Sequence, residues 1–75
     1  MEDIKKININ GCKIVKSTSS KLIGYKLIGD TIEVGDEIKI EKDGKEKLFP
    51  VGAIIKIKEN TYHILNSNIG IIIRK

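Results

Sequence analysis

The residues best suited to catalysis in this chain are a single cysteine, Cys12, and a single histidine, His63. A thiol and an imidazole form a nucleophile and base pair only when they meet in space and a further group orients the imidazole. No acidic motif accompanies either residue, and His63 alternates within residues 61–65 as a strand residue does. We therefore predict that the protein is not an enzyme and that His63 is a half-exposed strand residue.

Metal and nucleotide chemistry is equally poorly supported. One Cys and one His cannot supply the four ligands of a structural zinc site. The carboxylates Asp30, Glu33, Asp36 and Glu37 lie close together, but their spacing is not that of an EF-hand. The phosphate loop Gly-x-x-x-x-Gly-Lys-Ser/Thr is absent. We predict no metal and no cofactor, and we interpret residues 30–37 as a solvated acidic turn.

The basic residues point to a different kind of function. The net charge is +4 and the pI about 9.3, which favours polyanionic partners. With two tyrosines, one phenylalanine and one arginine, the chain has few groups that stack on bases or read base edges. We therefore predict weak, sequence-independent contact with RNA or a ribonucleoprotein through six lysines: Lys13, Lys16, Lys21, Lys26, Lys56 and Lys58.

The charge pattern is also compatible with a protein partner or with no binding function at all. Four acidic residues and no basic ones fall within residues 30–37, between two basic segments, so this turn could dock a basic protein partner. The lysines could also simply keep the protein soluble, as exposed charges usually do.

The composition predicts which elements carry these residues. Seventeen isoleucines stand against four leucines and one alanine, and β-branched side chains fit strands better than helices. Apolar runs broken by Gly, Asn and Asp predict a single all-β domain over residues 1–75. The predicted strands are Ile4–Ile9, Cys12–Val15, Leu22–Ile28, Thr31–Val34, Ile38–Glu41, Lys45–Phe49, Ile54–Lys58, Thr61–Leu65 and Ile69–Arg74.

Some positions within these strands have a specific expected role. Ile38 and Ile40 should point inward, Asp43-Gly44 should form a hairpin turn, and Phe49 should lie in the core. Residues 69–73 are apolar on both faces and should be paired on both sides, because an open edge there would aggregate. The structural turn residues are predicted to be Gly29, Gly35, Asp36 and Gly52. We predict a small, closed, six- to seven-stranded antiparallel β-barrel.

One stretch of the chain carries a family resemblance. Residues 23–40 read IGYKLIGDTIEVGDEIKI, followed later by Val51-Gly52-Ala53-Ile54 and by Asn68-Ile69-Gly70-Ile71-Ile72-Ile73-Arg74. These motifs resemble the second domain of translational GTPases such as elongation factor Tu. The resemblance implies a β-barrel of that type, known in prokaryotes also as small stand-alone proteins, with a translation-related role in contacting RNA. Since the chain stops before that family's closing strand, residues 4–9 would have to supply it.

A second resemblance competes with the first. Gly35-Asp36-Glu37-Ile38-Lys39-Ile40, then Gly44-Lys45 and Gly52-Ala53-Ile54-Ile55, are similar to the KOW motif, a small barrel of ribosomal proteins and transcription elongation factors. It too would imply a non-catalytic binding module.

The expected compartment follows from what the chain lacks. A single cysteine cannot form an internal disulfide, and the N-terminus has no signal-peptide profile. The longest apolar run is far shorter than a membrane helix. We predict a cytoplasmic protein with RNA, the ribosome or a protein as partner, and no membrane association.

Overall fold

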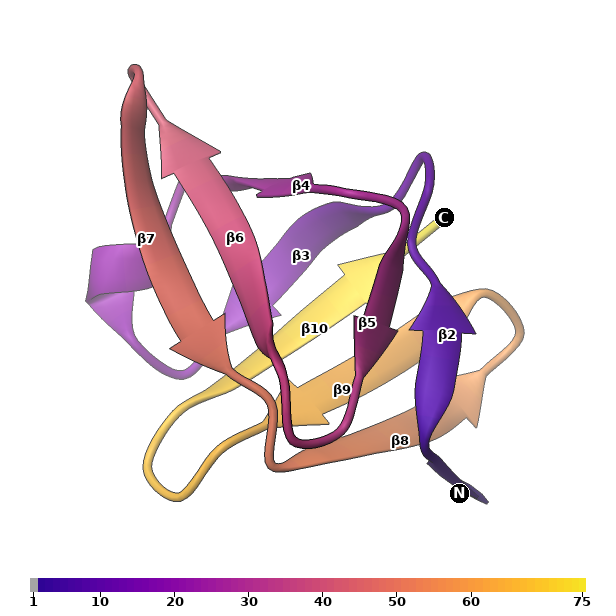
Figure 1. The fold of residues 1–75 in the computed structure, drawn as a ribbon. Coiled ribbons are helices and arrows are strands. Elements are labelled where there is room, and N and C mark those ends of the chain that lie inside the picture. Colours follow the sequence, from indigo (N-terminus) through magenta and orange to yellow (C-terminus); the bar gives the residue numbers. More distant parts are fainter. Residues whose placement is uncertain (1) are drawn as a thin grey trace.

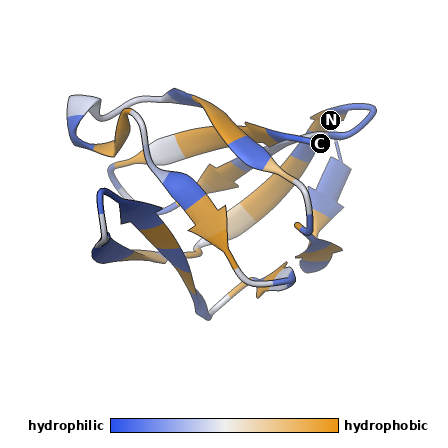
Figure 2. Cartoon of the chain, turned by 90° about the horizontal axis from the view of Figure 1, so that it is seen from above, coloured by the Kyte–Doolittle hydropathy of each residue, from blue (hydrophilic) through white to orange (hydrophobic). Residues whose placement is uncertain are grey.

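The alternation of apolar and polar residues produces strands along almost the whole chain. A computed structural model describes residues 2–75, which fold into short antiparallel strands and one 3-10 turn (Figure 1). Bands of apolar and polar residues alternate along the strands (Figure 2), as expected for sheets with one buried face. The all-β prediction is confirmed. The elements are β1 Glu2–Ile4, β2 Lys6–Asn8, β3 Lys13–Ser17, η1 Ser20–Leu22, β4 Lys26–Ile28, β5 Thr31–Glu33, β6 Glu37–Lys42, β7 Lys45–Pro50, β8 Ala53–Lys58, β9 Thr61–Leu65 and β10 Gly70–Arg74.

The largest sheet has five antiparallel strands in the order β1-β8-β9-β10-β3. Its inner face contributes four buried isoleucines to the core: Ile54, Ile64, Ile71 and Ile73. Strand β10, the most apolar segment, lies between β9 and β3. The prediction that residues 69–73 are paired on both sides is therefore confirmed.

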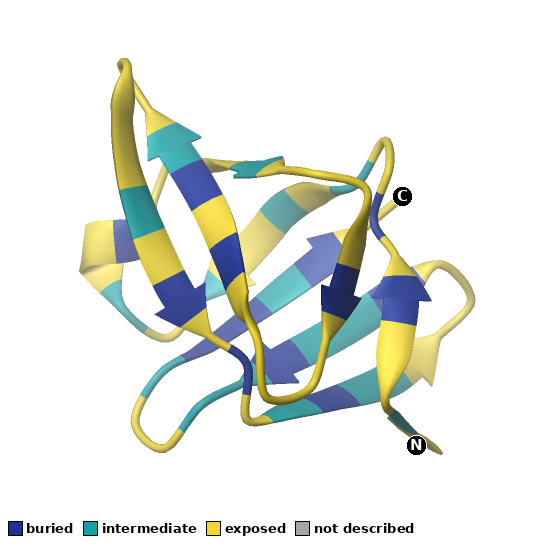
Figure 3. Ribbon diagram, viewed as in Figure 1, coloured by how far each residue is buried: buried dark blue, intermediate teal, exposed yellow. Residues whose placement is uncertain are grey.

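The β6–β7 hairpin and β4 form a second sheet. Asp43 and Gly44 have φ angles of 53° and 78°, so both central residues of the two-residue turn are left-handed, the geometry that matches the twist of a hairpin. Along β6, Ile38 and Ile40 are buried and Lys39 is exposed (Figure 3). The predicted hairpin and its inward and outward positions are confirmed.

The predicted closed barrel is wrong. The strands form three separate sheets, with β2 and β5 as an isolated pair. The N-terminal run, predicted as one strand over Ile4–Ile9, divides at Lys5, so that β1 pairs with β8 while β2 pairs with β5. Such short strands end before their ladders can join into one continuous sheet. The N-terminal run thus bridges two sheets without closing a barrel.

The strand predicted over Leu22–Ile28 is only half correct. The chain first forms the 3-10 turn η1, capped by Ser19, whose hydroxyl accepts a hydrogen bond of 3.3 Å from the backbone N–H of Lys21. Gly24 then has a φ of +83°, which turns the chain, and β4 begins only at Lys26. Leu22 is fully buried, so η1 is fixed to the core.

Backbone hydrogen bonds between loops connect the sheets. The N–H of Gly35, which has a φ of +95°, donates to the carbonyl of Val51 at 2.8 Å, and the N–H of Val51 donates to the carbonyl of Asp36 at 2.9 Å. The N–H of Gly52 donates to the carbonyl of Leu65 at 2.7 Å. The turn before β6 is thereby bonded to the segment entering the five-stranded sheet, and the predicted turn residues Gly35, Asp36 and Gly52 all lie at this junction.

The three sheets enclose one core. Its side chains are Ile7, Ile9, Leu22, Ile32, Ile38, Ile40, Phe49, Val51, Ile54, Ile64, Ile71 and Ile73. The predicted turn residue Gly29 has a φ of +112°. It precedes Asp30, whose carbonyl accepts a hydrogen bond of 2.6 Å from the N–H of Ile9 in the N-terminal segment. No helix within residues 2–75 has the length and apolar character needed to cross a membrane.

Candidate nucleic-acid interface

Two β-bulges shape the outer face of the five-stranded sheet. In β3, Lys16 pairs with Ile72 and Ile14 with Ile73, which leaves Val15 as the extra residue. In β8, the register shifts between Lys56 and Lys58, which leaves Ile57 unpaired. A bulge redirects the side chain of its extra residue. Val15 and Ile57 are accordingly 40% and 36% exposed, and both are found at the same surface depression.

This depression lies across strands β8, β9, β10 and β3 and has a volume of about 390 Å³. We call it the outer groove. Its apolar lining comes from the two bulge residues and from Ile72, and its charged lining comes from three cations. Thr61 is the remaining contributor, and its hydroxyl donates to the carbonyl of Glu59 at 3.4 Å. The lining residues are Val15, Lys16, Ile57, Lys58, Thr61, Ile72 and Arg74.

Two of the six predicted RNA-binding lysines, Lys16 and Lys58, line the outer groove, although one comes from β3 and the other from β8. A third, Lys13, is exposed and lies opposite Arg74 in the β3–β10 ladder. The tertiary structure therefore brings together half of the predicted set. No carboxylate lines the groove within the described part of the chain.

The other three predicted lysines lie elsewhere. Lys26 is on the β4-β6-β7 sheet, where its Nζ lies 3.2 Å from the Oε1 of Glu41. Lys21 is in η1. Lys56 lines an adjoining hollow that shares Ile57 and Lys58 with the outer groove and also contains Glu2 and Glu59. Lys21 and Lys26 thus do not line the outer groove, and Lys56 lies beside it in a hollow that also carries two carboxylates.

Arg74 is the site residue that sequence reasoning missed. In the sequence it follows an apolar strand, a position at which a charged residue commonly serves only to limit aggregation. In the structure it pairs with Thr61 on one side and with Lys13 on the other, at the groove. A guanidinium is well suited to phosphate because it donates two parallel hydrogen bonds. The only sequence signal was that Arg74 is the sole arginine of the chain.

Aromatic side chains of residues 2–75 do not line the groove. Phe49 is fully buried, as predicted, and Tyr62 packs against the core. Tyr25 also packs against the core, and the Nζ of Lys42 lies 5.9 Å from the centre of its ring. The groove thus offers aliphatic surface and positive charge but no ring on which a base could stack.

His63 and Cys12 occupy different environments. His63 is half-buried in β9, between its cross-strand neighbours Ile55 and Ile72, and its ring lies against Gly70. Cys12 follows the turn at Gly11 and packs at the edge of the core. Burial raises the pKa of the Cys12 thiol, and the positive charge of Lys75 partly opposes this shift. A raised pKa keeps the thiol protonated and makes it a poor nucleophile.

Alkylation of Cys12 by iodoacetamide is expected to be slower in the native chain than in the chain unfolded in urea at the same mildly alkaline pH. The reason is that the folded protein has less thiolate, since burial raises the pKa of Cys12. Because the Cys12 thiol loses its proton at lower pH in the unfolded chain than in the folded chain, the free energy of unfolding falls as pH rises through the range in which the thiol ionises. Rates measured by mass spectrometry across pH test this, and an equal midpoint in both states would contradict it.

The acidic segment has a structural role of its own. Glu33 lies opposite Lys6 in the β2–β5 pair, and the backbone at Asp36 bonds to Val51. The carboxylates of Asp30, Glu33, Asp36 and Glu37 are exposed. Within residues 2–75, no group of three or more His, Cys, Asp or Glu side chains is arranged to hold a metal ion.

Comparisons of the chain with protein-family models, with curated proteins and with solved structures found no match. The resemblances to the second domain of elongation factor Tu and to the KOW motif therefore rest on sequence motifs alone. Function has to be argued from the geometry of the outer groove.

Proposed function

We propose that this protein is a non-catalytic module that binds RNA, free or in a ribonucleoprotein, through the outer groove and without sequence preference. The observation that carries the proposal is the convergence of Lys16, Lys58 and Arg74 on one depression, whose lining from residues 2–75 includes no carboxylate. Lys13, next to Arg74 in the ladder, extends the positive surface along β3. These four cations come from three strands of one sheet: β3, β10 and β8.

The chemistry of the groove favours the phosphate backbone over the bases. Phosphate contacts by Lys and Arg give affinity without sequence information, whereas base recognition needs stacking rings or polar groups at base edges. The aliphatic lining from Val15, Ile57 and Ile72 offers apolar surface beside the cations, on which the sugars of a bound strand can pack. A translation-related role, as for the barrel of elongation factor Tu that the sequence resembles, is part of this proposal.

The test is a fluorescence anisotropy titration of a labelled oligouridine, and of total tRNA, at low and moderate salt. For four phosphate contacts to a single strand, the slope of log K against log salt is expected to be about −3. Lys16→Gln/Lys58→Gln/Arg74→Gln is expected to weaken binding by about 10- to 100-fold, because three exposed charge contacts contribute up to about 1 kcal/mol each.

The matched control replaces three lysines of the β6–β7 hairpin, Lys42, Lys45 and Lys47, by glutamine. It changes the net charge equally but leaves the groove intact, so its affinity is expected to change by less than about threefold. Equal losses in the two variants would show that only net charge matters and would overturn the assignment of the site. Absence of binding at low salt would overturn the RNA function itself.

A further inference from the structure

A second surface lies along the other edge of β3, where the five-stranded sheet ends. Among the described strands, β3 is hydrogen-bonded only to β10, and it contacts β4 without a ladder between them. Within residues 2–75, no backbone hydrogen bond joins β3 to the segment 22–24 that runs beside it. This is one of the places at which a closed barrel would have required pairing.

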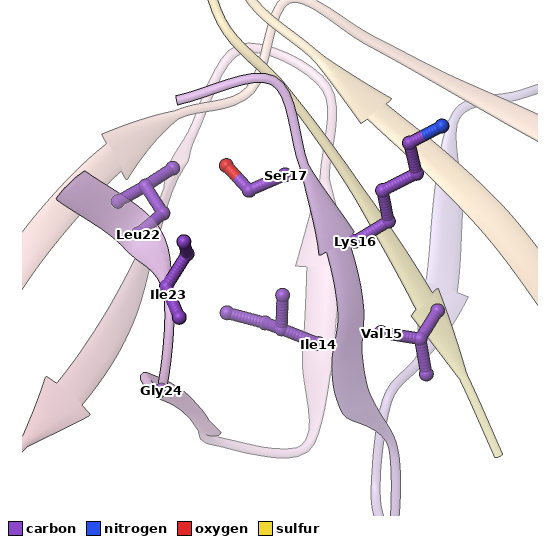
Figure 4. Close-up of a pocket in the computed structure, with 7 residues that line it drawn as sticks. All are labelled: Ile14, Val15, Lys16, Ser17, Leu22, Ile23 and Gly24. Carbon is purple, nitrogen blue, oxygen red and sulfur yellow. The ribbon is translucent and has the colours of Figure 1, made fainter. Parts of the chain in front are cut away.

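A cleft of about 160 Å³ occupies this gap. Figure 4 shows that Ile14 and Ser17 point from β3 toward Leu22 and Ile23, whereas Val15 and Lys16 point away on the opposite side of the strand. Ile23 is 64% exposed, the highest value among the large apolar side chains of residues 2–75. Apolar cavities of about 150 Å³ accept a molecule the size of benzene in other proteins, so this cleft has room for one aliphatic side chain.

The walls of the cleft are held in place before any partner binds. The Ser17 hydroxyl donates to the carbonyl of Ser19 at 2.9 Å and accepts from the N–H of Ser19 at 3.0 Å. Thr18 is bonded to Gly70 of β10 through its N–H at 2.9 Å, and its hydroxyl accepts from the Gly70 N–H at 2.7 Å. Fully buried Leu22 fixes the opposite wall. A preformed site loses less entropy on binding.

The charges around the cleft select its occupant. No carboxylate of the described residues lines the cleft. Lys16 lies at its edge with a side chain that points to the other side of β3, and Lys21 lies in the adjacent η1. The Nζ of Lys42 would lie 3.5 Å from a Cβ on Gly24. A second copy of the chain is a poor partner for this edge, because antiparallel pairing of two β3 strands would bring Lys13 and Lys16 of both copies together. An acidic strand has the complementary charge.

We propose that the open edge of β3 and the cleft beside it bind an extended, acidic peptide segment of a partner protein. The backbone of the peptide adds to the edge of β3, and one aliphatic side chain enters the cleft against Ile14 and Ile23. The carboxylates that alternate with it point to the other side of β3, toward Lys16. Strand addition of this kind takes its affinity from backbone hydrogen bonds and its specificity from side-chain pockets. The outer groove lies on the opposite side of β3 and shares Val15 and Lys16 with this site, but peptide addition to the strand edge does not depend on RNA binding.

The test is an NMR titration of the ¹⁵N-labelled protein with a capped synthetic peptide of alternating Glu and Ile. We expect amide shifts at residues 14–17 and 22–24, and slower hydrogen exchange along β3. Peptides alternating Lys and Ile, or Glu and Ser, are expected to bind at least about tenfold more weakly, since each lacks either the charge or the aliphatic anchor.

Two variants locate the site. Ile23→Ser is expected to weaken the affinity for the Glu/Ile peptide by about tenfold or more. Leu48→Ser should leave this affinity unchanged, because Leu48 is an exposed apolar residue of β7, 54% accessible, outside the cleft. Lys58→Gln/Arg74→Gln removes groove charges and should also leave peptide affinity unchanged. Shifts confined to β8 and β9, or no shifts at all, would overturn the proposal. Concentration-dependent broadening of β3 amides without peptide would show that a second copy occupies the edge and would overturn it too.

Discussion

Replacing Phe49 with alanine is expected to lower the free energy of unfolding by about 3–5 kcal/mol, the usual cost of emptying a buried aromatic position. Phe49 is 1% exposed and is the only aromatic residue in the fully buried core of residues 2–75. It lies at the end of β7, opposite Ile38 of β6, and two residues before Val51, which bonds to the turn before β6. Its removal therefore leaves a cavity where the β6–β7 hairpin joins the rest of the core.

The magnitude matters because the domain is small. At roughly 0.05–0.15 kcal/mol per residue, a chain of 75 residues has a total stability of about 4–11 kcal/mol. A loss of about 3–5 kcal/mol is therefore a large share of the total stability, and it is enough to unfold a chain at the lower end of this range.

Urea unfolding followed by far-UV circular dichroism measures this effect. The neighbouring residue provides the control: Leu48 is 54% exposed on the same strand, so Leu48→Ala should change stability by no more than about 0.5 kcal/mol. A cost below about 1 kcal/mol for Phe49→Ala would mean that this part of the core is not packed as described.

Replacing Gly70 with alanine is expected to destabilise the protein by about 1–3 kcal/mol, because the added methyl group overpacks the outer face. A Cβ at this position would lie 2.7 Å from the Nε2 of His63 and 3.1 Å from the Cδ2 of Leu65. The ring of His63 would have to leave its place between Ile55 and Ile72.

A double-mutant cycle assigns this cost to the His63 contact. Once His63→Ala has removed the ring, Gly70→Ala should cost much less, with a coupling of about 1 kcal/mol or more. Thermal unfolding of the four proteins gives the coupling directly. Additive effects would show that the strain arises at Leu65 or in the backbone instead.

Much of the fold could be predicted because local rules decide it. The sequence predicts a hairpin turn at Asp43-Gly44 and the structure has one there, because two adjacent residues that tolerate positive φ are sufficient to form such a turn. Ile38 and Ile40 face inward because the side-chain period of a strand is two. The pairing of β10 on both edges was predictable, because a strand that is apolar on both faces would aggregate at an open edge.

The errors in the fold prediction concern contacts between distant segments. The run Ile4–Ile9 has one uninterrupted strand pattern, yet it belongs to two sheets. Its first part pairs with β8 and its second part pairs with β5. The first part of Leu22–Ile28 forms a 3-10 turn, because capping by Ser19 and the burial of Leu22 outweigh its strand propensity. Closure of a barrel requires pairing between the strands of all three sheets, such as β3 with β4, and no local sequence pattern indicates whether these strands pair.

The same distinction between local sequence and distant contacts applies to the residues that could carry the function. Composition alone determined that this is a basic, isoleucine-rich β protein with one thiol and one imidazole, because charge and strand propensity are sums over residue types. Only the tertiary structure decided which cations act together. The bulges at Val15 and Ile57 and the pairing of Arg74 with Lys13 gather Lys16, Lys58 and Arg74 at one groove, while Lys26 pairs with Glu41 on another sheet. A bulge depends on the register of a distant partner strand, which the residues of one segment do not encode by themselves.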